Sequence, residues 1–203
     1  MAFIKTIPDS EINDDVRAMY QRQKAHYGFV PNYARVFCYR PEIMQLWAQL
    51  QLGIKHHMDR RRFELLTFVA AHTLRSTLCS LAHGKALTKF FSAEDVMAIA
   101  RGEAPASLSA AEAAMLVFAR KVTRDASAVV AEDIAELKRH GFVDAEIFDI
   151  SAAVAARAFW TKVIESLGVE AEAPFRAMGG FSRALAVGRP VDFPEPQLAQ
   201  AAG

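Results

Sequence analysis

Apolar residues recur every three or four positions along most of the chain, which is the spacing that places them on one face of a helix. A clear example is the set Ile43, Leu46, Trp47, Leu50 and Ile54. Pro41 precedes this set, and proline is well suited to the first turn of a helix. The pattern therefore predicts a helix over 41–57.

The same reasoning predicts helices along the rest of the chain. Their approximate ranges are 11–26, 33–39, 59–70, 76–90, 92–100, 109–118, 131–140 and 142–167, with a short helix near 175–187. No segment has the pattern of a strong strand. We therefore expect an all-α fold, in which the segment from Phe142 echoes the segment from Phe91 as a weak internal duplication of helical units.

The chain is expected to form one domain over 1–203, because this length suffices for one hydrophobic core and nothing in the sequence requires two. Residues 1–10 are predicted to be an extended arm. The tail 171–203 is interrupted by proline and glycine, so we expect it to be irregular and its last residues to be loose. Its apolar side chains, such as Phe175 and Phe181, are expected to pack on a neighbouring subunit.

The composition excludes several classes of function. Apolar residues make up 52% and charged residues 23% of the chain, which is the balance of a soluble globular protein. The formal net charge of +1 gives no electrostatic basis for binding nucleic acid or an anionic membrane. No run approaches the ~20 apolar residues of a membrane span, and the N-terminus lacks the apolar stretch of a signal peptide. Two cysteines, Cys38 and Cys79, fit a reducing compartment, so we predict a cytoplasmic protein.

The segment from Ser76 to His83 carries the residues best suited to chemistry. Cys79 and His83 are four positions apart, so on a helix they share a face and can share a proton. Ser76 is a preferred N-cap residue, which places Cys79 at the third helical position, where the helix dipole favours a negative sulfur. Glu64 would be roughly 22 Å from Cys79 along an unbroken helix, so the three groups meet only if the chain turns back near Ser76 and Thr77.

Each of these residues also has a purely structural interpretation. A free cysteine is usually a buried packing residue, and His83 alone would be a core histidine bonded to a carbonyl. Glu64 could instead pair with Arg61 or Arg62, although an apolar neighbourhood would raise the pKa of its carboxyl unless a partner compensates for burial. No histidine or cysteine cluster has the spacing of a metal site, and we expect neither a metal nor a cofactor.

Several motifs together resemble the AhpD-like, or carboxymuconolactone decarboxylase, superfamily, and in particular its peroxidase-related group. The first is the series Glu64, Ser76, Cys79 and His83, which is similar to the family's glutamate followed by C-x-x-C-x-x-x-H. The others are 27–32 (YGFVPN), 118–123 (FARKVT) and 165–168 (ESLG). The resemblance extends from about residue 19 to residue 167. It departs from the family at Ser76, which replaces the first cysteine, and at Leu78, where the family often has a histidine.

The resemblance implies an AhpD-like helical fold, a homo-oligomer and an antioxidant peroxidase with peroxiredoxin-type activity. In this interpretation Cys79 attacks a small-molecule hydroperoxide, and Glu64 and His83 relay its proton. Ser76 cannot close a disulfide, so oxidised Cys79 would need an external thiol reductant. Cys38 could take that part only with the two Cα atoms within about 7 Å of each other.

A non-redox function is the alternative. Carboxymuconolactone decarboxylases share the fold and keep a histidine at the matching helix without the cysteine pair. In such an enzyme, Glu64 and His83 would form an acid–base pair acting next to a carbonyl in a small carboxylic acid or lactone. Loss of the first cysteine at Ser76 favours this alternative, and retention of Cys79 favours thiol chemistry.

Overall fold

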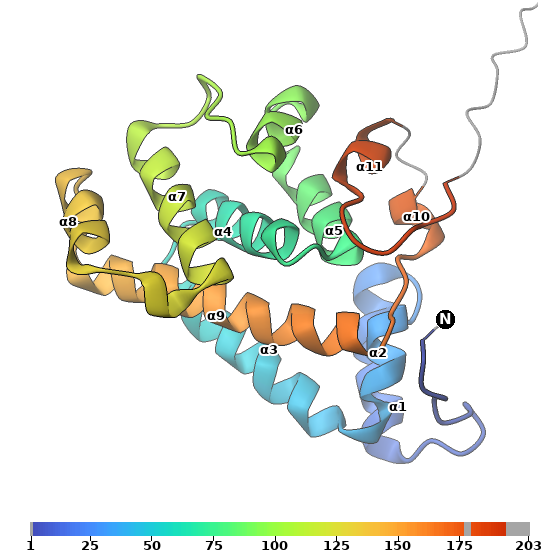
Figure 1. The fold of residues 1–203 in the computed structure, drawn as a ribbon. Helices are drawn as coiled ribbons and strands as arrows, with labels where there is room; N and C mark the ends of the chain where they lie inside the picture. The colour runs from blue at the N-terminus through green and yellow to red at the C-terminus, as the bar shows by residue number, and fades with distance from the viewer. Residues whose placement is uncertain (1, 177–179, 194–203) are drawn as a thin grey trace, which may run out of the picture.

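The structure is a computed structural model that describes residues 2–176 and 180–193, and every regular element in that part of the chain is helical (Figure 1). The α-helices are α1 (Asp14–Tyr27), α2 (Asn32–Val36), α3 (Pro41–His56), α4 (Arg60–Thr73), α5 (Thr77–Leu87), α6 (Ala93–Arg101), α7 (Ala110–Arg124), α8 (Ala131–Arg139), α9 (Asp144–Ser166), α10 (Ala173–Arg176) and α11 (Gly180–Leu185). Short 3-10 helices lie at Phe37–Tyr39 and Ala126–Ala128. The predicted all-α fold is confirmed, and the predicted ranges match these helices to within a few residues. The exception is the predicted helix 109–118, which the structure extends to Arg124 as α7.

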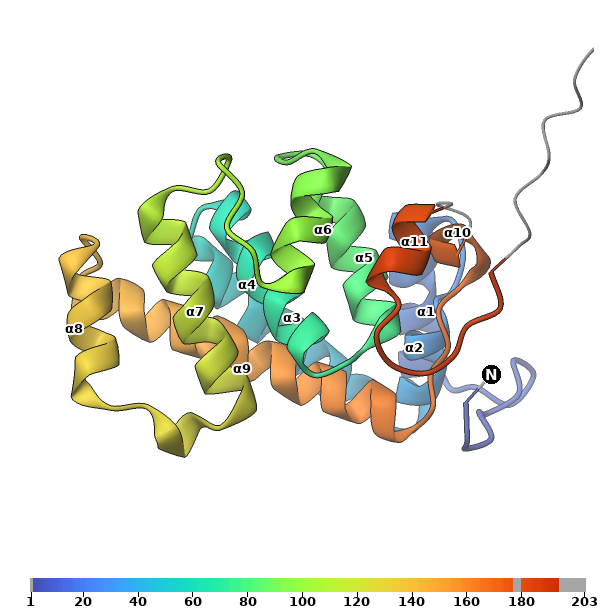
Figure 2. The same cartoon turned by 45° about the horizontal axis from the view of Figure 1, so that its top comes forward.

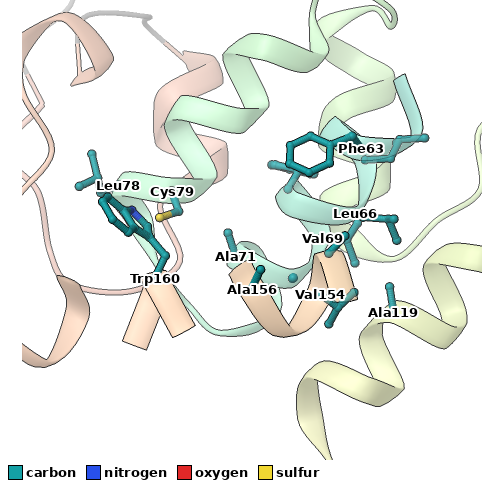
Figure 3. Close-up of a cluster of buried hydrophobic side chains, with 14 of the residues drawn as sticks. Phe63, Leu66, Val69, Ala71, Leu78, Cys79, Ala119, Val154, Ala156 and Trp160 are labelled. Carbon is teal, nitrogen blue, oxygen red and sulfur yellow. The ribbon is translucent and has the colours of Figure 1, made fainter. Parts of the chain in front are cut away.

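Helix α4 lies at the centre of the molecule. Every residue from Phe63 to Ala71 is buried, because helices α5, α7 and α9 pack around it. Its start is fixed by Asp59, whose carboxylate accepts a hydrogen bond from the Arg62 N–H at 2.9 Å. Phe63, Leu66, Val69 and Ala71 of this helix lie in the hydrophobic core (Figure 3). Glu64 belongs to the same buried stretch of α4 and is 8% exposed.

A tight turn reverses the chain between α4 and α5. Arg75 has a φ of 59°, the left-handed conformation that commonly ends a helix, and the Ser76 N–H donates to the Ala71 carbonyl at 3.1 Å. Ser76 is the N-cap of α5, as expected, since its hydroxyl accepts from the Cys79 N–H at 3.3 Å. The reversal brings α5 back along α4.

Helix α9 forms the floor of the site together with α3. Trp47 of α3 stacks on Trp160 of α9 with ring centroids 4.0 Å apart, and the indole N–H of Trp47 donates to the Ala156 carbonyl at 3.4 Å. Residues 2–13 form no helix and reach the end of α9, where the Phe3 N–H donates to the Leu167 carbonyl at 2.8 Å.

The described part of the tail packs on α5 of the same chain (Figure 1, Figure 2). It contains two short helices, α10 and α11, where the sequence predicted one near 175–187. Leu185 is fully buried against Gly84, and the Gly188 N–H donates to the Thr77 hydroxyl at 3.0 Å. The predicted packing of the tail on a neighbouring subunit stays a prediction, and its residues 177–179 and 194–203 lie outside the described part. Among the described helices, none has both the length and the apolar character to cross a membrane.

Candidate active site

Glu64 of α4 and His83 of α5 form a hydrogen bond of 2.9 Å between Oε2 and Nδ1. Burial alone would raise the pKa of the Glu64 carboxyl, but the bond to His83 and the nearby cations Lys55 and Arg60 bring that pKa below its usual value. Burial lowers the pKa of His83, and the positive charge of Arg157 lowers it further. The pair is therefore an ionised carboxylate and a neutral imidazole at neutral pH.

The tautomer of His83 follows from these charge states. An ionised Glu64 only accepts hydrogen bonds, so Nδ1 of His83 must carry the proton and Nε2 must carry the lone pair. The histidine is not sealed in the core, since 19% of its side-chain surface is exposed. His83 is thus an oriented imidazole whose side chain is partly exposed.

Arg61 and Arg62, the alternative partners of Glu64 in the sequence analysis, form ion pairs with other carboxylates. Arg61 binds Glu112 with an Nε–Oε1 distance of 2.6 Å, and Arg62 binds Asp59 at 3.4 Å and Glu146 at 3.5 Å. Glu64 therefore pairs with His83 rather than with either of them.

Cys79 lies at the third position of α5 and is 4% exposed. Figure 3 shows its sulfur directed toward Trp160, with Leu78 beside it. Its polar neighbour is Thr161 of α9, whose hydroxyl donates to Sγ at 3.8 Å. The structure gives no hydrogen bond between Cys79 and His83 within its described residues, although the two lie one turn apart on the same helix.

Ser76 occupies the position of the family's first cysteine and links α5 to α9. Its hydroxyl donates to Oε1 of Glu165 at 2.6 Å while accepting the Cys79 N–H. The other carboxylate oxygen of Glu165 lies 3.5 Å from Nε of Arg189. Thr161 and Glu165 were missed by the sequence analysis, although they sit four residues apart on the helix that ends in the ESLG motif.

Cys38 lies in the 3-10 helix Phe37–Tyr39 and is buried. Its sulfur accepts the Ile7 N–H at 3.4 Å, and both cysteines are free thiols. This contact gives Cys38 a structural role in holding the N-terminal arm.

Aromatic rings fill the space between Cys79 and the 27–39 region. Besides Trp47, Trp160 packs on Phe37 with centroids 4.8 Å apart and on Tyr33 with centroids 5.3 Å apart. Burial raises the pKa of Tyr33 far above its ordinary range, so the phenol stays neutral and donates to Oε1 of Gln23 at 2.8 Å. The sulfur therefore borders a rigid aromatic wall.

The same arrangement of helices occurs in solved structures. A peroxidase-related protein with an alkylhydroperoxidase AhpD core, from Ralstonia eutropha JMP134, matches with a TM-score of 0.73 and 23% identity over 86% of this chain and 94% of that chain. The chain has the AhpD-like fold. A peroxidase-related protein from Silicibacter sp. TM1040 shares this fold with a TM-score of 0.74 and 21% identity, over 89% of this chain and 95% of that chain. The debrominase Bmp8 also shares this fold, with a TM-score of 0.71 and 17% identity over 89% of this chain and 96% of that chain.

The AhpD-like fold predicted from the motifs is therefore confirmed. No protein-family model and no curated protein sequence matches the chain. AhpD-like proteins of this shape include peroxidase-related proteins and a debrominase, so the activity of this chain has to be argued from its own side chains.

Proposed function

We propose that the protein is a thiol-dependent hydroperoxide reductase in which Cys79 is the attacking sulfur. The observation that carries the proposal is the Glu64–His83 hydrogen bond, which orients a neutral imidazole one helical turn from a cysteine at a helix N-terminus. An oriented base beside a thiol is the general arrangement for activating a nucleophile.

In the proposed reaction, Nε2 of His83 takes the proton of Cys79. The thiolate then attacks the terminal oxygen of the hydroperoxide, so that an S–O bond forms and the O–O bond breaks. The proton returns from His83 to the leaving oxygen, which departs as an alcohol or as water, and Cys79 becomes a sulfenic acid. Glu64 keeps the imidazole in the required tautomer and stabilises it while it is charged.

An external thiol completes the cycle, because the hydroxyl of Ser76 cannot form a disulfide. That thiol attacks the sulfenic sulfur, releasing water and leaving a mixed disulfide, and a second thiol then releases Cys79 as a thiol. The bond from Ser76 to Glu165 supports a structural function for this hydroxyl.

Stoichiometric oxidation tests the proposal. The protein is treated with one equivalent of hydrogen peroxide or cumene hydroperoxide, trapped with dimedone and mapped by mass spectrometry. We expect prompt sulfenic acid at Cys79 and at least tenfold slower trapping in His83→Ala and Glu64→Gln, since a positioned base contributes about 10²-fold or more.

Cys38→Ala is the matched control, because Cys38 is a second buried cysteine without a neighbouring histidine. Its oxidation rate at Cys79 should equal that of the unmodified chain. A Cys79 that stays reduced under these conditions, or that reacts equally fast without His83, contradicts the proposal. Since Bmp8 is a debrominase solved as a cysteine-to-alanine variant with 2,3,4-tribromopyrrole, that compound serves as a further probe of the thiol.

A non-redox acid–base enzyme of carboxymuconolactone decarboxylase type is the second candidate. It is favoured by the contacts of Cys79, whose polar partner is Thr161 rather than His83, while the Glu64–His83 pair is complete without the sulfur. This candidate is tested by NMR in deuterated water, which follows exchange of the proton next to the carbonyl of a small carboxylic acid or lactone. We expect the exchange to persist in Cys79→Ala and to be lost in His83→Ala.

A further inference from the structure

Helix α9 passes the start of α5 in the opposite direction, as the order of two contacts shows: Glu165 binds Ser76, and Thr161 binds Cys79. Glu165 and Thr161 are four residues apart and hold the start of α5 by the bonds described above. Arg157 is four residues further along the same face of α9. Because the two helices run in opposite directions, Arg157 lies at the level of His83.

Arg157 is a buried cation that forms no salt bridge within the described part of the chain. It is 3% exposed, and its Nε atom has no hydrogen-bond partner. Within residues 2–176 and 180–193 its neighbour is the face of Trp47, 5.5 Å from the guanidinium carbon to the ring centroid. A buried guanidinium that lacks a carboxylate costs several kcal/mol, so this arrangement needs a compensating anion.

A second unpaired hydrogen-bond donor lies on helix α3, which packs on α9. Gln51 of α3 is 5% exposed, and its amide nitrogen Nε2 has no hydrogen-bond partner. Trp47, Gln51 and Lys55 are spaced four residues apart on α3, so they form one stripe, and the Trp47 end of this stripe faces Arg157. Arg157 lies over Trp47 and its charge acts on Lys55, so Gln51, between these two on the stripe, is inferred to lie near Arg157.

The charges around this place are mainly positive. Lys55 and Arg60 stand near Glu64, and burial followed by the positive charge of Arg157 lowers the pKa of His83. Burial also lowers the pKa of Lys55, with Glu64 opposing and Arg157 adding to the shift. Glu64 is the carboxylate that faces this group from α4, and it is already bonded to His83.

We propose that Arg157 and Gln51, with Lys55 at the rim, bind the carboxylate group of the substrate beside His83. The planar fork of a guanidinium matches a carboxylate in a bidentate pair, and the Gln51 amide supplies a further donor. The identity of the substrate rests on the proposed function: if the protein reduces hydroperoxides, this site restricts them to hydroperoxides that carry a carboxylate. The binding step itself does not depend on the thiol chemistry.

Binding of propionate to the full-length protein tests the site directly. The chain has two tryptophans, Trp47 and Trp160, which stack on each other below Arg157, so intrinsic fluorescence reports on the site. We expect a saturable change with propionate and none with propionamide, its neutral isostere. Arg157→Met should weaken propionate binding at least tenfold, since a charge-assisted pair contributes about 1.5–3 kcal/mol, and Arg157→Lys should bind with intermediate strength.

Arg120→Met is the matched control, because Arg120 is a partly buried arginine whose guanidinium donates to the Ile99 carbonyl. It should bind propionate as the unmodified chain does. Arg157→Met should also unfold at an equal or higher temperature, because it removes an unpaired buried charge. If Arg157→Met and Arg157→Lys both fail to fold, Arg157 has a structural role and the proposal is overturned.

A pair of hydroperoxides links binding to reaction. Cumene hydroperoxide and its para-carboxylate derivative differ by one anionic group, and we expect the derivative to oxidise Cys79 with a lower KM that rises in Arg157→Met. Propionate binding that is absent, or equal in Arg157→Met, overturns the anion site whatever the thiol does. Binding that behaves as expected beside an inert Cys79 instead contradicts the proposed function and leaves the anion site standing.

Discussion

At the scale of single residues, the site depends on a hydroxyl and an imidazole that link neighbouring helices. The Ser76 hydroxyl caps α5 through the Cys79 N–H and binds Glu165 of α9. The His83 imidazole binds Glu64 of α4 through Nδ1. Substitutions at such residues therefore change both stability and chemistry, and the two effects can be measured separately.

Two substitutions of Ser76 test separate properties: the stability that its hydroxyl provides, and the disulfide that a cysteine at this position would form. Ser76→Ala should lower the free energy of unfolding by about 1–2 kcal/mol, because an N-cap bond is lost and a side-chain acceptor loses its donor; urea titration measures it, with Ser76→Thr as the control. Ser76→Cys should let oxidised Cys79 close an intramolecular disulfide, seen as the loss of two hydrogens by mass spectrometry. A sulfenic acid at Cys79 that persists in that variant would argue against the geometry described here.

His72 makes stability depend on pH in a defined window. Burial, then the charges of Arg120 and Arg75, lower the pKa of His72 from 6.5 to about 4. Between these values the unfolded chain binds more protons, so the stabilisation is complete above pH 6.5 and is lost as the pH falls toward 4. The loss should be on the order of 2 kcal/mol after allowance for partial exposure.

Urea titrations at neutral and acidic pH check this expectation. His72→Leu should reduce the pH dependence between the two values. The lowered pKa values of His83 and Glu64 act in the same direction, so a residual slope in the variant is expected. An unchanged slope would exclude His72 as the main titrating group.

At the scale of elements, the close approach of α11 to α5 depends on one glycine. A Cβ atom built on Gly84 would overlap Cδ1 of Leu185, which is fully buried, and would touch Phe68. A side chain at position 84 would therefore force the Leu185 side chain or helix α11 to shift.

Gly84→Ala should lower the free energy of unfolding by about 1–3 kcal/mol through overpacking, although alanine is the better helix former. Gly53→Ala in α3 is the matched control, because nothing lies within 4 Å of a Cβ at that position; it should raise stability by about 0.5–1 kcal/mol. The double variant Gly84→Ala/Leu185→Ala should cost less than the sum of its single changes. Strict additivity in that cycle would contradict the contact.

The sequence was most informative about helices and about the residues of α4 and α5. Regular spacing of apolar residues located the helices, and the capping preference of Ser76 located the turn that joins Glu64 to His83. The partners from α9 could not be found in this way, because Thr161, Glu165 and Arg157 are polar residues within a long helix that could have faced solvent. The long-range packing of α9 against α4, α7 and α3 decides which of its faces is buried.

At the scale of the whole molecule, the homo-oligomer expected from the family resemblance stays a prediction that the surface allows us to test. Leu46 and Leu50 of α3 are 59% and 52% exposed, and with Ile43 they form an apolar stripe at helical spacing. Such a stripe is typical of a surface that packs on another helix. We expect a second copy of the chain to cover it.

Light scattering coupled to size exclusion measures the mass in solution. The unmodified chain should exceed the 22.4 kDa of one copy, and Leu46→Glu/Leu50→Glu should shift the mass toward one copy. Val117→Glu is the control, since Val117 is 70% exposed but lies on α7. A monomeric unmodified chain would show the prediction to be wrong.

The antiparallel pairing of α5 with α9 divides the site into three levels, each one helical turn from the next. Under the proposed function and anion site, the level of Ser76 bears on how an oxidised sulfur returns to the thiol, the level of Cys79 carries the reacting sulfur, and the level of Arg157 selects the substrate. The levels are coupled, because Ser76 accepts the Cys79 N–H and the charge of Arg157 acts on His83. A one-residue insertion in α9 ahead of Arg157 would turn Arg157, Thr161 and Glu165 away from α5 together, by about 100° at 3.6 residues per turn.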